Sequence, residues 1–153
     1  MLTVGELAPD FTLPTDSGDD LTLSALRGRP VVLFFYPKDD TSGCTTEACE
    51  FRDLFPRFDA SKAVVLGMSP DPVKSHQKFK AKYELPYPLV ADTEKVALQA
   101  YGVWKEKSMY GKKYMGVERT TVVIDAEGRV VKVFEKVKPA GHAAAVMEVV
   151  DAL

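Results

Sequence analysis

The chain has 153 residues, enough for one compact domain with a full core and too few for two ordinary ones, so we expect a single domain over residues 1–153. Its composition is that of a globular protein, with 46% hydrophobic and 27% charged residues and a net charge of −2. This balance gives no electrostatic reason to bind nucleic acid or an anionic membrane, and it favours a small-molecule or protein partner.

The N-terminus has neither the basic segment nor the apolar segment of a secretory signal. The longest apolar run, residues 30–37, is far shorter than the roughly 20 residues that a membrane helix needs. These features predict a cytoplasmic protein. In that reducing compartment the two cysteines are more typical of catalysis, metal binding or inert packing than of a permanent disulfide.

The first expected elements are a β-hairpin, a buried strand and a helix. Alternating runs at 10–14 and 21–23 flank turn-forming residues, and the continuously apolar run 31–36 is typical of a strand buried on both faces. A helix follows, which Pro56 should end or kink near Phe55. Its apolar positions recur every three or four residues: Ala48, Phe51, Phe55 and Phe58.

The middle of the chain alternates between short strands and helices. Residues 63–68 predict a second buried strand, after which Asp71 can cap a helix that starts at Pro72 and runs to about Tyr83. A short strand at 88–91 precedes Asp92, which can cap a further helix over 94–100. We expect residues 101–118 to form a long polar-aromatic loop.

The last third predicts a hairpin and a closing helix. Residues 120–124 and 130–134 flank a strong turn signal, and 143–153 form an amphipathic helix. The element order implies an α/β fold with a central mixed β-sheet flanked by helices, after an N-terminal β-hairpin.

Cys44 follows the first buried strand and falls in the first turn of the next helix. The carboxyl ends of strands in such sheets bind ligands, and the free N–H groups of a helix start stabilise a thiolate. Helical spacing places Cys44 on the face of Ala48 and Phe51, in a partly enclosed pocket. The alternative, a small buried hydrophobe, is equally common from position alone.

Cys49 favours the chemical interpretation. Five helical residues turn through about 500°, so the two side chains point ~140° apart. The rise of about 7.5 Å alone places the two Cα atoms beyond the ~7 Å limit of a disulfide. Five residues of unwound chain would let the sulfurs meet. This arrangement suits an attacking thiol and a resolving thiol that meet when the helix opens locally.

Two other residues could assist Cys44. Thr41 offers a hydroxyl one turn before it, and Arg119, just before the strand at 120–124, offers a positive fork that cannot lose its proton. A surface arginine at a strand edge is the commoner interpretation of Arg119 from sequence alone.

The run Pro37-x-x-x-Thr41-x-x-Cys44 resembles the peroxiredoxin active-site signature. The continuation Cys44-Thr45-Thr46-Glu47-Ala48-Cys49 resembles the PrxQ subgroup, also called bacterioferritin comigratory protein. The likeness spans nearly the whole chain, from the segment at 5–13 to the segment at 116–121.

The resemblance implies a thioredoxin-like fold and an atypical 2-Cys peroxidase, reducing hydrogen peroxide and organic hydroperoxides. Cys44 would be oxidised to a sulfenic acid, Cys49 would resolve it as an intramolecular disulfide, and thioredoxin would reduce the pair. The implied pocket and substrate-binding residues are Pro37, Thr41, Gly43, Glu47 and Arg119, with Glu47 holding the arginine. No cofactor and no metal are implied, and a monomer is expected because the C-terminal resolving cysteine of the dimeric peroxiredoxins is missing.

Full ionisation of an ordinary thiol at pH 7 increases the amount of reactive thiolate only ~30-fold. The lower nucleophilicity of a thiol with a lowered pKa partly offsets this gain. Thr41 and Arg119 should therefore orient the peroxide and stabilise its leaving oxygen.

Three other functions compete with a peroxidase. A copper chaperone would use both cysteines and a histidine, but neither His76 nor His142 has an evident reason to approach Cys44, and both are expected to face solvent. A protein-binding or holdase module has no support in charge or patterning, and a general disulfide oxidoreductase lacks C-x-x-C.

The aromatic residues of the expected loop have two interpretations. Trp104 is expected to pack in the loop with Tyr101, Tyr110 and Tyr114, an aromatic rim around the pocket being the alternative.

Overall fold

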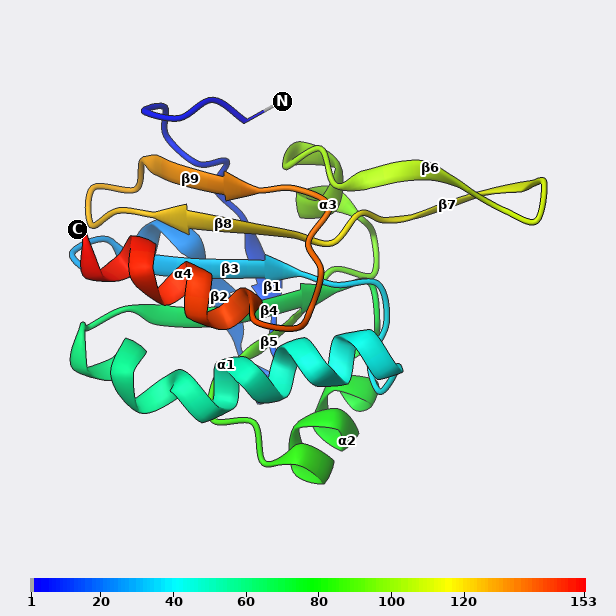
Figure 1. The fold of residues 1–153 in the computed structure, drawn as a ribbon, viewed down its shortest axis with the longest axis horizontal. Helices are drawn as coiled ribbons and strands as arrows, with labels where there is room; N and C mark the ends of the chain where they lie inside the picture. Colours follow the sequence, from blue (N-terminus) through cyan, green and yellow to red (C-terminus); the bar gives the residue numbers. More distant parts are fainter. Residues whose placement is uncertain (1) are drawn as a thin grey trace.

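The computed structural model describes residues 2–153, and its centre is a mixed five-stranded sheet of order β5-β4-β3-β8-β9 (Figure 1). The strands are β3 (Val31–Phe35), β4 (Val64–Ser69), β5 (Leu89–Ala91), β8 (Thr120–Ile124) and β9 (Val130–Phe134). β3, β4 and β5 are parallel, β8 is antiparallel to β3, and β9 is antiparallel to β8. The expected central mixed sheet is confirmed.

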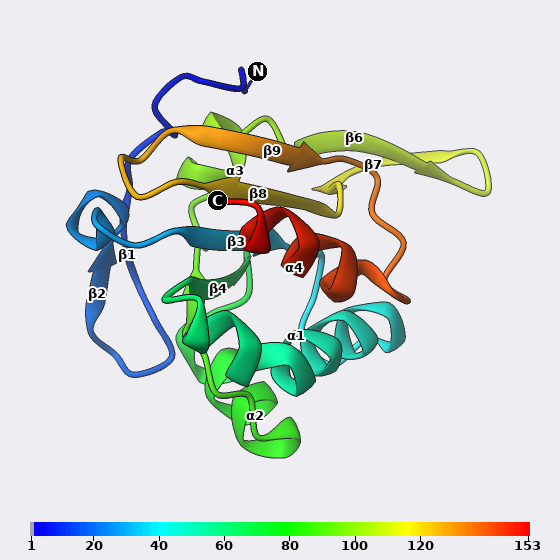
Figure 2. The same cartoon turned by 60° about the vertical axis from the view of Figure 1, so that its left-hand side comes forward.

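Successive side chains of β3 enter two different cores, because they point to opposite faces of the sheet. One core contains Val32, Phe34 and Tyr36 and is covered by α1 (Ser42–Ala60), α2 (Val73–Tyr83) and α4 (His142–Asp151). The other contains Val31, Leu33 and Phe35 and is covered by the 3-10 helix η1 (Leu23–Leu26) and by α3 (Val96–Ala100). Figure 2 shows α1 and α4 together on the first face.

Two hairpins lie outside the central sheet. The N-terminal one pairs β1 (Thr12–Pro14) with β2 (Asp20–Thr22), as the sequence predicted. The other pairs β6 (Trp104–Met109) with β7 (Lys112–Val117) and projects from the body of the molecule (Figure 1). The expectation of a loop over 101–118 was wrong, because most side chains of this hairpin are exposed and no apolar alternation marks its strands.

Pro56 was predicted to end or kink the helix near Phe55. Helix α1 continues through Pro56 to Ala60, so the predicted end near Phe55 was wrong. Proline removes one backbone hydrogen bond, here the one that Arg52 O would accept, but buried Phe51 and Phe58 hold the helix on the sheet on both sides of it.

Two capping predictions had different outcomes. α2 begins at Val73, and Asp71 does not cap it; its carboxylate instead accepts hydrogen bonds from Ser69 Oγ and from the Asp39 amide. Asp92 does accept the amides of Val96 and of Leu98, at 2.9 and 2.8 Å, and so caps α3.

The register of the sheet determines which loops meet. Phe35, the last residue of β3, lies opposite Thr120, the first residue of β8. The loop into α1 and the residue before β8 are therefore neighbours at one edge of the sheet. No helix within residues 2–153 has the length and apolar character to cross a bilayer.

Candidate active site

Cys44 is in the first turn of α1 and is only 1% exposed. It packs in the core with Ala48 and Phe51, as helical spacing predicted. The residue at the helix N-cap is Thr41, whose side chain does not cap the helix. Its hydroxyl donates to Lys38 O at 2.9 Å, so its oxygen keeps acceptor capacity at the start of the helix.

Arg119 links the helix to the sheet. Its Nη2 donates to Cys44 Sγ at 3.3 Å, and its Nη1 donates to Glu47 Oε1 at 2.8 Å. The side chain is 15% exposed, so it is not the surface arginine that sequence alone favoured. Burial lowers the pKa of Arg119, but Glu47 and Cys44 outweigh it and leave the pKa raised, which keeps the guanidinium charged.

Gly43 lies beside this contact. A Cβ atom on Gly43 would stand 3.2 Å from Arg119 Nη2, so glycine leaves the guanidinium room to reach the sulfur. Pro37 follows β3 and is half-buried at the start of the loop into α1.

Glu47 is fully buried behind Arg119. Burial raises its pKa to about 7, although Arg119 acts in the opposite direction. Its Oε2 is the one buried side-chain oxygen or nitrogen among the described residues that has no hydrogen-bond partner. This atom lies 3.9 Å from His142 Nε2.

His142 is a site residue that sequence reasoning missed. It was expected to face solvent, but it is buried, with Nε2 2.7 Å from Thr121 Oγ1. Burial, and secondly Arg119, lower its pKa to about 4, so the ring is neutral at pH 7. The only sequence signal was its place at the start of a helix that had to pack on the sheet.

Cys49 is half-buried one turn further along α1, and both cysteines are free thiols. Burial raises the pKa of Cys49, with Arg52 acting in the opposite direction. Ala48 precedes Cys49 in the helix, and its carbonyl oxygen accepts a hydrogen bond from the Tyr87 hydroxyl at 2.6 Å. The intact helix therefore keeps the two thiols apart, and Cys49 is a weak nucleophile within it.

The second histidine, His76, was also expected to be exposed and is fully buried. Its Nδ1 lies 2.7 Å from Asp39 Oδ2, and its Nε2 lies 2.9 Å from Val90 O. Tyr36 also donates to Asp39, at 2.6 Å. These contacts anchor the loop between β3 and α1.

The copper alternative needs both cysteines and a histidine around one point. Within residues 2–153, the one group of three potential metal ligands is Asp39, Asp71 and His76, which contains no cysteine. Its oxygens already accept hydrogen bonds from Tyr36, Ser69 and the Asp39 amide. This cluster is a hydrogen-bonded loop anchor.

The aromatic residues around the β6–β7 hairpin do not share one environment. Tyr101 is buried and donates to Pro9 O at 2.6 Å, whereas Tyr110 is 99% exposed at the tip. Trp104 packs at the edge of the second core.

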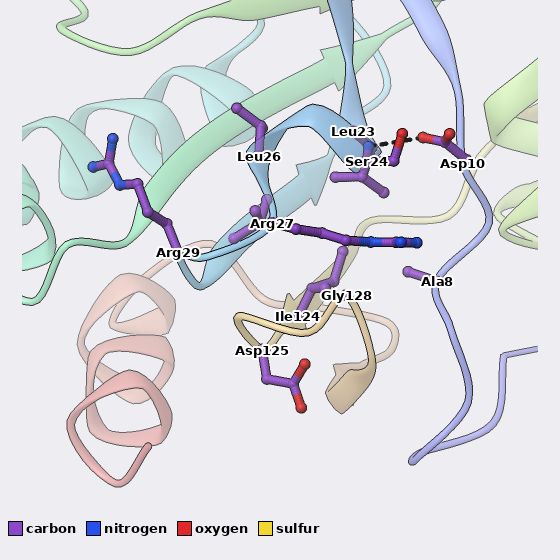
Figure 3. A pocket seen from close by; sticks show the side chains of 11 residues that line it. Ala8, Asp10, Leu23, Ser24, Leu26, Arg27, Arg29, Ile124, Asp125 and Gly128 are labelled. Carbon is purple, nitrogen blue, oxygen red and sulfur yellow. Dashed lines mark hydrogen bonds between the residues drawn. The ribbon is translucent and has the colours of Figure 1, made fainter.

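A small hollow at the opposite end of the sheet is lined by η1, the N-terminal segment and the turn between β8 and β9 (Figure 3). Its volume of about 10 Å³ has room for about one water molecule. It adjoins Val31 and Ile124, which pair at the far end of β3 from the cysteine, so it is separate from the site around Cys44.

Comparison with known proteins adds an independent result. Residues 4–133 match the AhpC/TSA family. Peroxiredoxin Bcp of Bacillus subtilis is 47% identical over 147 residues, covering 96% of this chain and 94% of that protein. A Coxiella burnetii protein named as a bcp peroxiredoxin is 52% identical over 146 residues, covering 95% of this chain and 97% of that one.

A solved structure shows the same architecture. It is that of Xanthomonas campestris bacterioferritin comigratory protein, described for its alkyl peroxide reduction activity. The two chains are 44% identical and superpose with a TM-score of 0.92, covering 99% of this chain and 97% of the other.

Proposed function

Since this chain belongs to the AhpC/TSA family, and within it to the Bcp or PrxQ peroxiredoxins with their thioredoxin-like fold, we propose that it reduces hydroperoxides at Cys44 and resolves the product with Cys49. The observation that carries this proposal is the bridge that Arg119 forms between Cys44 and Glu47. A fixed positive charge at the sulfur stabilises the thiolate and then the negative charge that develops on the leaving oxygen.

In the first step the Cys44 thiolate attacks the terminal oxygen of the peroxide. The S–O bond forms as the O–O bond breaks, the sulfur is oxidised to a sulfenic acid, and the leaving oxygen takes a proton to become water or an alcohol. Thr41 is proposed to bind the peroxide through its free acceptor capacity, and Pro37 and Gly43 to shape the pocket around it.

In the second step the start of α1 unwinds and the Cys49 thiolate displaces hydroxide from the sulfenic sulfur, which yields a disulfide and, after protonation, water. Unwinding removes the burial that raises the pKa of Cys49, so the resolving thiol becomes more reactive as it becomes able to reach Cys44. A reduced dithiol protein, proposed to be thioredoxin, then exchanges with the disulfide and restores both thiols.

Both hydrogen peroxide and organic hydroperoxides are proposed substrates, and the alkyl peroxide reduction described for the Xanthomonas campestris relative supports the second class. We further propose a single domain over 1–153, a monomer and a cytoplasmic location. A thiol pair that cycles through a disulfide suits a reducing compartment.

The test is peroxide consumption coupled to thioredoxin, with mass spectrometry after one equivalent of peroxide. Wild type should lose two hydrogen atoms and contain a Cys44–Cys49 disulfide. Cys44→Ser should be inactive, and Cys49→Ser should stop at a Cys44 sulfenic acid that dimedone traps. Peroxide turnover by Cys44→Ser would refute the attacking role, and a stable sulfenic acid beside free Cys49 in wild type would refute the resolving role.

A further inference from the structure

The Oε2 atom of Glu47 is buried without a hydrogen-bond partner, although Oε1 of the same carboxyl is fully engaged by Arg119. A buried ionised oxygen without a donor is unfavourable, whereas a protonated one is itself a donor. His142 Nε2 lies 3.9 Å from this oxygen, and it could accept such a proton only in exchange for its contact with Thr121 Oγ1 at 2.7 Å.

The groups around Glu47 favour a proton on the carboxyl over one on the imidazole. Arg119, just before β8, and His142, from α4, face it directly, and Glu50 and Cys44 share its helix. Tyr87, before β5, is the other titratable group near it, and its pKa is raised by burial and then by Glu47. Burial raises the pKa of Glu47 to about 7, with Glu50 adding to the rise and Arg119 opposing it. His142, with its pKa lowered to about 4, is too weak a base to take the proton at neutral pH.

Arg119 makes the charge of Glu47 depend on the state of Cys44. Its two nitrogens contact both groups, so a thiolate and a carboxylate would compete for one positive charge. When the sulfur becomes a neutral sulfenic acid, that competition ends, and the guanidinium then favours the ionised form of Glu47.

We propose that Glu47 is a redox-linked proton site: it holds a proton on Oε2 while Cys44 is a thiolate, and it releases that proton when Cys44 is oxidised. This inference rests on the proposed peroxidase cycle. The step is thiolate, protonated Glu47 and hydroperoxide going to sulfenic acid, ionised Glu47 and alcohol or water. Glu47 gives up one proton as the leaving oxygen takes one up, so the step balances and the net charge around Arg119 stays constant.

Glu47 acts through Arg119 and is a positioning residue. With Glu47 neutral, the whole charge of Arg119 acts on the sulfur and the leaving oxygen. With Glu47 ionised, Arg119 is shared between two anions, and peroxide reduction should slow as the pH rises above about 7.

Infrared difference spectroscopy on the Cys49→Ser protein, which stops at the sulfenic acid, tests the proposal. Oxidation by one equivalent of hydrogen peroxide should remove a protonated-carboxyl C=O band, shifted in deuterium oxide, and add carboxylate bands. Glu47→Gln in the same background should lack this change. Glu50→Gln, the matched control on the same helix whose carboxylate accepts the Gly141 amide, should keep it.

The pH profile of Cys44 oxidation gives a second measurement. Wild type and Glu50→Gln should slow several-fold above about pH 7, and Glu47→Gln should not, since its amide keeps an acceptor for Arg119 without titrating. A carboxyl band that oxidation leaves unchanged would overturn the proton site, as would a Glu47→Gln protein with the wild-type pH profile. Failure of the underlying peroxidase function is distinct, because wild type would then not consume peroxide at any pH.

Discussion

At the scale of single residues, the proposed mechanism depends on the two donors of Arg119. Lysine would keep the positive charge but could not reach Cys44 Sγ and Glu47 Oε1 together. We expect Arg119→Lys to lower kcat/KM for hydrogen peroxide by roughly 10²- to 10³-fold, as for loss of one transition-state donor. Arg57→Lys, at an exposed ion pair with Asp151, is the control and should keep wild-type kinetics. Equal kinetics for both variants would contradict the role of the two Arg119 donors.

Glu47 also makes stability depend on pH. Its pKa is raised from 4.5 to about 7 in the folded protein, so between these values the folded state binds more protons than the unfolded state. Its contribution therefore becomes less favourable as the pH rises through this window, by up to roughly 3 kcal/mol. Glu47→Gln removes this contribution. The free energy of unfolding of the variant minus that of wild type, measured in urea, should therefore increase from pH 4.5 to pH 7. A constant difference between the two proteins would contradict the raised pKa.

The sequence predicted those candidate site residues that lie close together along the chain. Thr41, Cys44 and Cys49 follow from helical spacing, whereas Glu47 follows from the resemblance. Arg119 needed the resemblance, because its approach to the sulfur depends on sheet register. His142 and its partner Thr121 were missed, since a histidine buried by packing between a helix and a sheet has no local pattern.

At the scale of secondary structure, the proposed cycle requires α1 to open so that the thiols meet, and the contact of Tyr87 with α1 should oppose this opening. Its buried hydroxyl donates to Ala48 O, between the two cysteines. Tyr87→Phe should destabilise the intact helix by about 1 kcal/mol and speed disulfide formation up to ~5-fold. Quenched-flow counting of free thiols after peroxide addition measures this rate.

Tyr101→Phe is the matched control for that prediction. Tyr101 makes a bond of the same 2.6 Å length to a backbone carbonyl, that of Pro9, in the other core. It should lose comparable global stability without changing the rate of disulfide formation. Equal acceleration in both variants would mean that general destabilisation, not the contact with α1, limits the rate.

The elements that could be predicted were those with a clear pattern of apolar or turn-forming residues. The apolar runs at β3 and β4 and the turn between β8 and β9 were recognised because core strands and tight turns need those residue types. The β6–β7 hairpin was missed because its strands are mostly exposed and its turn uses Tyr110, at φ 51°, before Gly111. Asparagine is the residue usually expected before such a glycine.

At the scale of the whole molecule, the two ends of the sheet differ in the contacts that they contain. One end holds Cys44 and Arg119, and the other is closed by the turn between β8 and β9, where Figure 3 shows Arg27 lying across Gly128. A Cβ atom at Gly43 would press on Arg119 Nη2, whereas one at Gly128 would lie 2.9 Å from Arg27 Nε on a backbone with φ +86°.

Two alanine substitutions should therefore separate activity from stability. Gly43→Ala should lower kcat/KM for peroxide while leaving the denaturation midpoint unchanged or higher, since alanine favours helix. Gly128→Ala should lower stability by roughly 1–2 kcal/mol and leave kcat/KM of the folded protein unchanged. Thermal unfolding and peroxide kinetics measured on both proteins test this contrast, and a loss of activity in folded Gly128→Ala would contradict it.

Pro56 has a consequence for the exchange of backbone amide protons with solvent. Because it gives no N–H to Arg52 O, the ladder of α1 is interrupted between the segment that carries both cysteines and the last turn, which buried Phe58 holds. The earlier segment can open without the later one, as a cooperative unit smaller than the fold. In deuterium exchange, amides between Thr45 and Arg52 should therefore exchange through an opening that is separate from that of Phe58 to Ala60. Pro56→Ala should bring the two groups closer together.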